Sequence, residues 1–475
     1  MNRTKKLAIN TAVLTFGKIC TQFVSFLLLP LYTAILEPRV YGIADLFNSY
    51  IYLIIPVVSL MLEQGLFRFL LDCRNDTNRQ KTLLSTVLCI NLIEIVAYTI
   101  FYMAIQRYIQ SQYKIFILID VSLNILLNTF LQYVRGIGRN GTYSFISFLS
   151  ATSIVVANVI LLVVFRTGAW GLFVSTVIGR SVALVAIMLM VRIWGVYSPR
   201  MFSRAEAKTL LKYSIPFIPN QLSWWAVGVS DRTIVSWFLG IAANGLYSVA
   251  NKFSSVYITF YNIFNLSWTE SVSLHITDDD AEEYLEKMIN SLFPIFYAVC
   301  IGIIAYMPLI FPFLIDKQYN AAYKQIPILM IAVLFQVIVG LYSVVYVALK
   351  ESKEIAKTSF FAAIINIVVN ILLIKFIGLY AASISTLVAY VTMAIYRYFH
   401  IKKYINIPLK HKMLYLLIAI AVVMSYYVNM LLTNILTAIF VTIYSIVSNK
   451  EFVTGAVGMM FDLMKKIIDK KEKRK

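Results

Sequence analysis

Charged residues are scarce in this chain. Only 14% of its 475 residues are Asp, Glu, Lys or Arg, whereas 60% are hydrophobic, and the mean hydropathy is +0.78. An ordinary soluble domain is about 25% charged and about 45–50% apolar, so a soluble fold is excluded. A helix needs about 20 mostly apolar residues to cross a hydrocarbon core. The chain offers many such runs, and we therefore predict an all-α polytopic membrane protein.

Motifs for catalysis and for metal binding are lacking as well. The four cysteines, Cys20, Cys73, Cys89 and Cys300, are scattered and form no C-x-x-C pair, which argues against a zinc site or a disulfide framework. The three histidines form no H-E-x-x-H, and neither a Walker A nor a G-x-S-x-G sequence occurs. We therefore expect neither an enzyme nor an ATP-driven mechanism within this chain, and no cofactor beyond a coupling ion, either a proton or sodium.

Apolar runs separated by charged residues, Gly or Pro predict about 14 transmembrane helices. They cover residues 7–36, 41–71, 82–105, 115–134, 143–165, 170–194, 211–239, 246–274, 285–314, 323–349, 355–377, 380–399, 413–430 and 432–447. Whether the last two runs both span stays open. Prolines inside these runs, at 30, 56, 216, 219 and 294, predict bends or hinges.

The net charge of +19 lies mainly in short loops and in the C-terminal tail. This placement fits membrane orientation and contact with lipid head groups, and argues against a nucleic-acid partner. Lys and Arg favour the side that holds both termini by roughly four to one, so both termini are predicted to be cytoplasmic. The acidic segment 278–283 is read as a solvated helix cap, with docking of an assembly protein as the alternative.

Two segment pairs indicate an internal repeat. Residues 41–47 (YGIADLF) resemble 247–253 (YSVANKF), and 168–176 (GAWGLFVST) resemble 378–386 (GLYAASIST). The offsets span six predicted helices, which preserves orientation and implies two parallel lobes with a cavity between them. The predicted organisation is an N-terminal six-helix lobe (1–194), a cytoplasmic linker (195–212), a C-terminal six-helix lobe (213–403), two additional helices (404–448) and a basic amphipathic cytoplasmic tail (449–475).

An ionisable side chain within an apolar span costs free energy to place in the membrane, so such residues are candidates for function. The cations Lys18, Arg180, Arg232 and Lys252 are predicted to line a substrate-translocation cavity, with internal ion pairs or snorkelling as the structural alternative. The acids Glu94 and Asp231 are the candidates for ion coupling.

Several segments resemble the bacterial oligosaccharide flippases, the Wzx-type members of the multidrug/oligosaccharidyl-lipid/polysaccharide exporter superfamily. They are residues 17–22 (GKICTQ), 28–32 (LLPLY), 41–45 (YGIAD), 63–68 (EQGLFR), 211–225 (LKYSIPFIPNQLSWW), 230–240 (SDRTIVSWFLG) and 244–253 (NGLYSVANKF). The resemblance covers nearly the whole chain, but the motifs are loose.

The resemblance implies a flippase in the bacterial cytoplasmic (inner) membrane. Such a protein moves an undecaprenyl-diphosphate-linked oligosaccharide to the outer leaflet by alternating access, for surface polysaccharide biosynthesis. Cations suit a diphosphate, so the four candidates above fit this role. Two alternatives remain: a multidrug/ion antiporter of the same superfamily, which would favour acids in its cavity, and a membrane-embedded glycosyltransferase or polymerase, which would carry a sizeable loop with catalytic acids.

Overall fold

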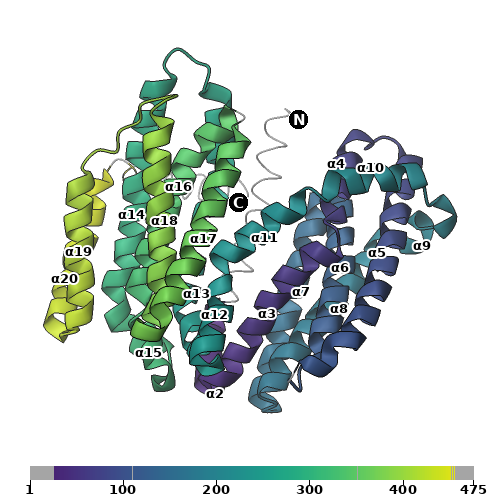
Figure 1. The fold of residues 1–475 in the computed structure, drawn as a ribbon, viewed down its shortest axis with the longest axis horizontal. Helices are drawn as coiled ribbons and strands as arrows, with labels where there is room; N and C mark the ends of the chain where they lie inside the picture. The colour runs from purple at the N-terminus through teal and green to yellow at the C-terminus, as the bar shows by residue number, and fades with distance from the viewer. Residues whose placement is uncertain (1–25, 110, 350, 451, 453, 455–475) are drawn as a thin grey trace, which may run out of the picture. The chain divides into compact units, whose positions relative to one another are not determined.

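The computed structural model describes residues 26–109, 111–349, 351–450, 452 and 454 (Figure 1). Helices and short connections make up this part of the chain, and it contains no β-strand. Nine helical segments of the described residues are long and apolar enough to cross a membrane: Pro38–Val58, Thr77–Tyr108, Ile115–Gly136, Asn140–Val164, Ala169–Val191, Ala281–Leu314, Ile326–Ala348, Lys353–Ile377 and Leu431–Ser448. The prediction of an all-α polytopic membrane protein is confirmed. The count of 14 spans stays a prediction.

The described residues form two compact units. Unit 1 comprises residues 26–260, Ile315–Gln325 and Ser359–Ala389. Its elements are α2 (Leu29–Ile35), α3 (Pro38–Val58), α4 (Leu62–Asp72), α5 (Thr77–Ile105), η1 (Gln106–Tyr108), α6 (Ile115–Gly136), α7 (Asn140–Val159), the π-helix η2 (Ile160–Val164), α8 (Ala169–Val191), α9 (Ile193–Val196), η3 (Pro199–Met201), α10 (Arg204–Ser214), α11 (Phe217–Gly228), α12 (Ser230–Leu239), η4 (Lys317–Tyr319) and α15 (Asn320–Tyr323).

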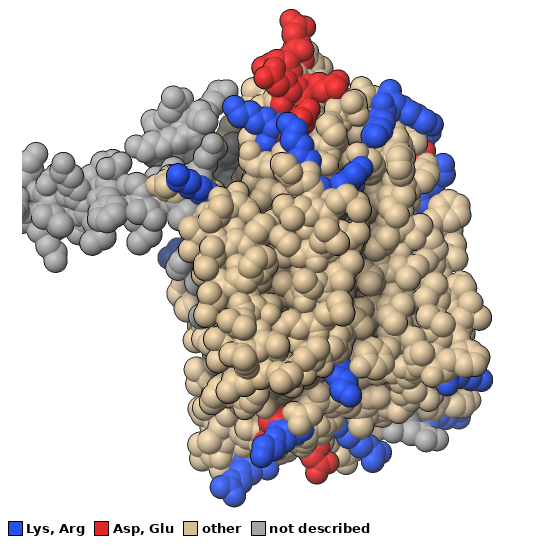
Figure 2. All heavy atoms as spheres, turned by 90° about the vertical axis from the view of Figure 1, so that its left-hand side faces the viewer, with Lys and Arg blue, Asp and Glu red and all other residues tan. Residues whose placement is uncertain are grey.

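Unit 2 comprises Tyr261–Leu314, Ile326–Thr358 and residues 390–450. It contains α14 (Ala281–Leu314), α16 (Ile326–Ala348), α19 (Lys412–Val428) and α20 (Leu431–Ser448). Three long helices contribute to both units: α13 (Ile241–His275), α17 (Ser352–Ile377) and α18 (Tyr380–Ile401). Within unit 2, α14 packs against α16, α19 and α20. Figure 2 shows a face on which charged side chains lie toward the two ends, with a broad band of other residues between them. This distribution suits a surface in contact with lipid.

The core of unit 1 follows from helical spacing. Leu62, Leu66 and Leu70 recur every four residues along α4 and are completely buried. They belong to one apolar cluster with side chains of α5, α6, α8 and α10. Residues four apart lie on one face of a helix, so α4 buries a single apolar stripe.

Two of the predicted helices are broken into shorter ones. The run 41–71 is divided into α3 and α4, because Leu60 and Met61 adopt positive φ angles of 47° and 56°. The Ser59 hydroxyl accepts a hydrogen bond from the Met61 N–H over 3.2 Å, which satisfies a donor that the break would leave free. The prediction of one continuous helix here is wrong.

The run 211–239 is likewise not one helix. It is divided among the end of α10, α11 and α12. Pro216 precedes α11 and has no N–H to continue the ladder from α10, while Val229 leaves helical geometry between α11 and α12 (φ −135°, ψ −23°). The predicted bend at Pro216 is therefore present, but the break at Val229 was not predicted.

The second repeated segment has the same local structure in both copies. Gly168 and Gly378 have φ angles of 57° and 56°; Gly168 directly precedes α8, and Gly378 lies two residues before the start of α18. In each copy a Thr hydroxyl lies within hydrogen-bonding distance of the carbonyl oxygen four residues earlier: Thr176 of Leu172 and Thr386 of Ala382, both at 2.9 Å. The likeness of these segments is thus conformational as well as chemical.

Candidate functional site

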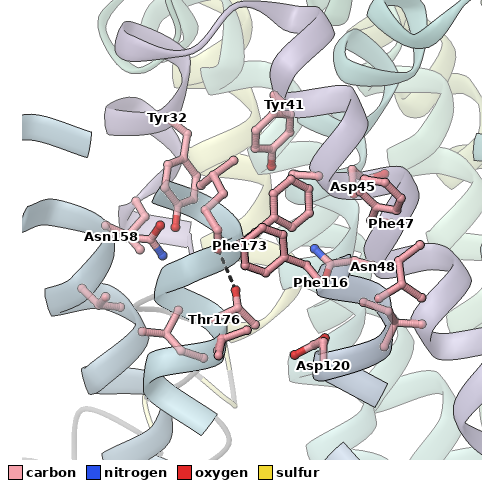
Figure 3. A pocket seen from close by; sticks show the side chains of 18 of the residues that line it. Tyr32, Tyr41, Asp45, Phe47, Asn48, Phe116, Asp120, Asn158, Phe173 and Thr176 are labelled. Carbon is pink, nitrogen blue, oxygen red and sulfur yellow. Dashed lines mark hydrogen bonds between the residues drawn. The ribbon is translucent and has the colours of Figure 1, made fainter. Parts of the chain in front are cut away.

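A polar cavity of about 240 Å³ lies inside unit 1 (Figure 3). It is bounded by α2, α3, α6, α7 and α8, with one residue from α13. Aromatic rings and polar groups share its wall. The lining comprises Leu28, Tyr32, Tyr41, Ala44, Asp45, Phe47, Asn48, Ile51, Phe116, Ile117, Asp120, Ala151, Ile154, Val155, Asn158, Leu172, Phe173, Thr176, Val177 and Lys252.

Helical periodicity brings these side chains to one place. On α3, Tyr41, Asp45 and Asn48 are spaced by four and three residues and therefore share a face. The same spacing places Phe116 beside Asp120 on α6. Figure 3 shows these labelled side chains converging on the cavity from different helices. Three- and four-residue spacing therefore places these side chains on one face of each helix, and helix packing brings the faces together.

Two ion pairs accompany the cavity. Arg232 Nε donates to Asp45 Oδ2 over 2.7 Å, and their side chains are only 14% and 17% exposed. The Ser248 hydroxyl donates to the same carboxylate oxygen over 2.5 Å. Arg180 pairs with Asp120, and these side chains are 17% and 5% exposed. Both acids of the cavity wall are therefore neutralised by an arginine from another helix.

Lys252 adds a further positive charge to the cavity wall. It lies in the electrostatic field of both Asp45 and Arg232. Among the described residues, no carboxylate lies within ion-pairing distance of its ammonium group. The cavity and its immediate surroundings thus hold three cations and two carboxylates.

Asp231 lies in a different polar cluster of unit 1. It is 2% exposed and accepts hydrogen bonds from Tyr247 over 3.0 Å, Asn370 over 2.9 Å and Thr386 over 2.7 Å. These donors come from α13, α17 and α18. Three side-chain donors thus satisfy the hydrogen-bonding capacity of this buried carboxylate.

Glu94 lies in neither polar group. It lines a second cavity of about 630 Å³, formed by α3, α5 and neighbouring residues, whose wall is otherwise nearly all apolar or aromatic. Both carboxylate oxygens of Glu94 are buried and have no hydrogen-bond partner among the described residues. The two candidate coupling acids therefore occupy very different surroundings.

The four predicted cavity cations are only partly placed by the structure. Lys252 lines the cavity, whereas Arg180 and Arg232 lie beside it in ion pairs with its acids. Lys18 lies outside the described residues. The role of these four residues in binding a substrate stays a prediction.

Three residues of the cavity were missed by reasoning from the sequence. Asp120 lies in a predicted span and meets the same criterion that selected Arg180, so the signal was present. Asp45 lies near the start of its span, where an interfacial position was the simpler reading. Asn158 is neutral, and nothing in its apolar surroundings marks it as part of a site.

An all-helical polytopic fold around a polar cavity is typical of membrane transporters. The chain belongs to the family described as polysaccharide biosynthesis protein, whose family model matches residues 31–324. No curated protein matches the sequence.

Solved structures share the fold at low sequence identity. The lipid II flippase MurJ in an inward closed conformation superposes with a TM-score of 0.67 at 18% identity, covering 94% of this chain and 100% of that chain. An inward-facing multidrug resistance MATE family transporter of the MOP superfamily gives 0.65 at 13% identity, covering 82% and 98%. A MOP superfamily transporter from Pyrococcus furiosus, for which a reversed polarity of the binding pocket suggests a different function, gives 0.56 at 14% identity, covering 83% and 95%. The chain therefore has the fold of these transporters.

Proposed function

We propose that this protein is a flippase that moves an undecaprenyl-diphosphate-linked oligosaccharide from the cytoplasmic to the outer leaflet of the bacterial cytoplasmic membrane. The transport step is alternating access, both termini are cytoplasmic, and the product feeds surface polysaccharide biosynthesis. Membership of the polysaccharide biosynthesis family supports this proposal. The fold shared with a lipid II flippase supports it further, because that protein also handles a lipid-linked substrate.

The observation that carries the proposal is the charge of the unit 1 cavity. Each acid in its wall is paired with an arginine, and Lys252 contributes a further cation that forms no ion pair with the described residues. Such a wall attracts an anion, and a diphosphate forms strong charge-assisted hydrogen bonds with Lys and Arg. Lys252 would contact the diphosphate first. Arg180 and Arg232 would join it by exchanging Asp120 and Asp45 for phosphate oxygens, and Lys18 is proposed as the fourth ligand.

Transport against a gradient needs an energy source, and we propose that a proton or sodium ion supplies it. Asp231 is the favoured coupling acid, because its three hydrogen-bond donors hold a carboxylate in a fixed geometry at a buried position. Glu94 is the second candidate. Its carboxylate lacks a partner, so protonation would remove an unfavourable buried charge.

A multidrug/ion antiporter is the second candidate function, since transporters of that kind share the fold. A cavity for organic cations would present unpaired acids, whereas Asp45 and Asp120 are each paired here. This difference favours the anionic lipid-linked substrate. A glycosyltransferase or polymerase is the least favoured alternative.

The proposal is tested in the host by removing the protein and following the polysaccharide precursor. We expect surface polysaccharide to disappear and the lipid-linked oligosaccharide to accumulate in the cytoplasmic leaflet, with both effects reversed by the wild-type chain. Unchanged surface polysaccharide together with increased sensitivity to organic cations would contradict the flippase and support the antiporter.

A further inference from the structure

Asn158 differs from the other buried asparagines of the described residues. Six asparagines are less than 9% exposed, namely Asn91, Asn158, Asn244, Asn366, Asn370 and Asn434. Five of them donate a hydrogen bond from Nδ2 to another group of the protein. The Oδ1 atoms of all six lack a hydrogen-bond partner among these residues, so Asn158, which is 2% exposed, is the one whose Nδ2 donates to none of them either. A buried amide without a partner is unfavourable, so this side chain is suited to a ligand that supplies one.

The local backbone places this amide at the cavity. Asn158 lies at the end of α7, directly before the π-helix η2 (Ile160–Val164). Short π-helical segments within α-helices are frequent at functional sites. Figure 3 shows the Asn158 amide and the Tyr32 hydroxyl directed into the same space, with Thr176 nearby.

Aromatic rings provide apolar contacts in the same cavity, beside these amide and hydroxyl groups. Phe116 and Phe173 are stacked, with ring centroids 5.3 Å apart and planes inclined by 16°, and both line the cavity. The cavity therefore combines flat apolar surface with amide and hydroxyl groups. A pyranose ring has the matching character, because one face presents C–H bonds and its rim carries hydroxyl groups that both donate and accept hydrogen bonds.

The volume of the cavity and the charge of its wall restrict the class of ligand further. Pockets for drug-sized ligands measure about 300–1,000 Å³, whereas this cavity measures about 240 Å³ and thus suits one sugar ring together with the phosphate next to it, which Lys252 would contact. Both acids of the wall are paired with arginines, which disfavours an organic cation. Resting on the function proposed above, we infer that the unit 1 cavity is a saccharide subsite that takes one sugar ring of the lipid-linked substrate, with Asn158 as its hydrogen-bonding residue and the Phe116–Phe173 pair as its apolar wall.

The subsite is tested with the full-length protein in lipid nanodiscs. Two probes are used separately: the free oligosaccharide released from the host's own lipid-linked precursor, and undecaprenyl phosphate without sugar. Asn158→Leu is compared with Asn91→Leu, which removes a buried amide of unit 1 away from the cavity lining. We expect Asn158→Leu to weaken oligosaccharide binding by roughly five- to tenfold, the effect of one lost hydrogen bond. Binding of undecaprenyl phosphate should not change, and Asn91→Leu should bind both probes as the wild type does.

Thermal unfolding of both variants shows whether a loss of binding comes from a loss of folded protein. Leu at 158 removes an unpartnered polar group, so the folded state should be at least as stable as in the wild type. Equal oligosaccharide binding by the wild type and Asn158→Leu would overturn the subsite, as would a wild-type protein that binds only undecaprenyl phosphate. Either result can occur while export still depends on the chain, whereas failure of the flippase itself is seen as normal export in cells that lack the protein.

Discussion

Arg232 Nε donates a hydrogen bond to Asp45 Oδ2 over 2.7 Å and thereby joins α12 to α3 across 187 residues of sequence. Both side chains are largely buried, and Ser248 of α13 donates to the same carboxylate oxygen. The pair thus fixes three helices beside the cavity and neutralises one of its two acids.

Removing one member of this pair should destabilise the protein. Arg232→Gln leaves Asp45 buried with only the Ser248 hydroxyl as a hydrogen-bond donor, and breaking a buried pair in this way costs about 3–5 kcal/mol. We expect less folded protein in the membrane and a lower unfolding temperature in detergent.

The double variant Asp45→Asn/Arg232→Gln removes both charges and is the matched comparison. It should recover most of the lost stability, because no uncompensated charge remains. If the double variant is as unstable as the sum of the single variants, the two side chains do not act as a pair.

A close crossing of α3 and α13 lies beside the ion pair. A Cβ atom added to Gly245 would clash with the Pro38 carbonyl oxygen, and one added to Gly42 would lie 2.8 Å from the Gly245 backbone nitrogen. The Asn244 amide donates to the Gly42 carbonyl over 3.0 Å across the same crossing. Small residues allow membrane helices to approach this closely.

Gly245→Ala should therefore lower the free energy of unfolding by about 1–3 kcal/mol, the cost typical of overpacking, and this is seen as a lower unfolding temperature of the purified protein. The control is Gly302→Ala in α14, where the added Cβ meets no atom within 4 Å. That variant should be neutral or slightly stabilising, because Ala favours a helix over Gly by about 1 kcal/mol. Equal effects of the two substitutions would contradict the close crossing.

Much of the fold could be predicted from the sequence. The length of the apolar runs between charged residues reflects the thickness of a membrane. The predicted run 115–134, for example, agrees closely with α6 (Ile115–Gly136). The break at Leu60 and Met61 could not be predicted, since it places residues without special turn propensity at positive φ angles. Tertiary packing, and not local preference, stabilises that turn.

The site was less accessible to prediction than the fold. The free-energy cost of a charge inside the membrane marked Arg180 and Arg232 as candidates, but it gave no information on their partners, Asp120 and Asp45. Such pairs depend on which helix faces meet, and one sequence does not contain that information. Asn158 carries no charge and was missed for the same reason.

The coupling acid can be identified by comparing two neutral substitutions. Asp231→Asn keeps an oxygen that can accept from Tyr247 and Thr386, and its new amide N–H can donate to Asn370 Oδ1 if the Asn370 amide flips, so folded protein should be nearly normal while ion-driven export falls at least tenfold. Glu94→Gln should leave export nearly unchanged if Asp231 is the coupling acid. Export is measured with the transmembrane proton and sodium gradients collapsed separately, which identifies the ion. The assignment is wrong if Asp231→Asn exports normally and Glu94→Gln does not.

The central claim is that the cavity cation Lys252 binds the diphosphate of a lipid-linked oligosaccharide. It is tested most directly by measuring surface polysaccharide export in cells that depend on this protein, with wild type, Lys252→Gln and Lys252→Arg compared at equal amounts of folded protein. Lys357→Gln is the control, since Lys357 is an exposed lysine paired with Glu354 in unit 2. Loss of a charge-assisted hydrogen bond, worth about 1.5–3 kcal/mol, predicts at least a tenfold fall for Lys252→Gln, partial export by Lys252→Arg and normal export by the control. Normal export by Lys252→Gln would contradict the account.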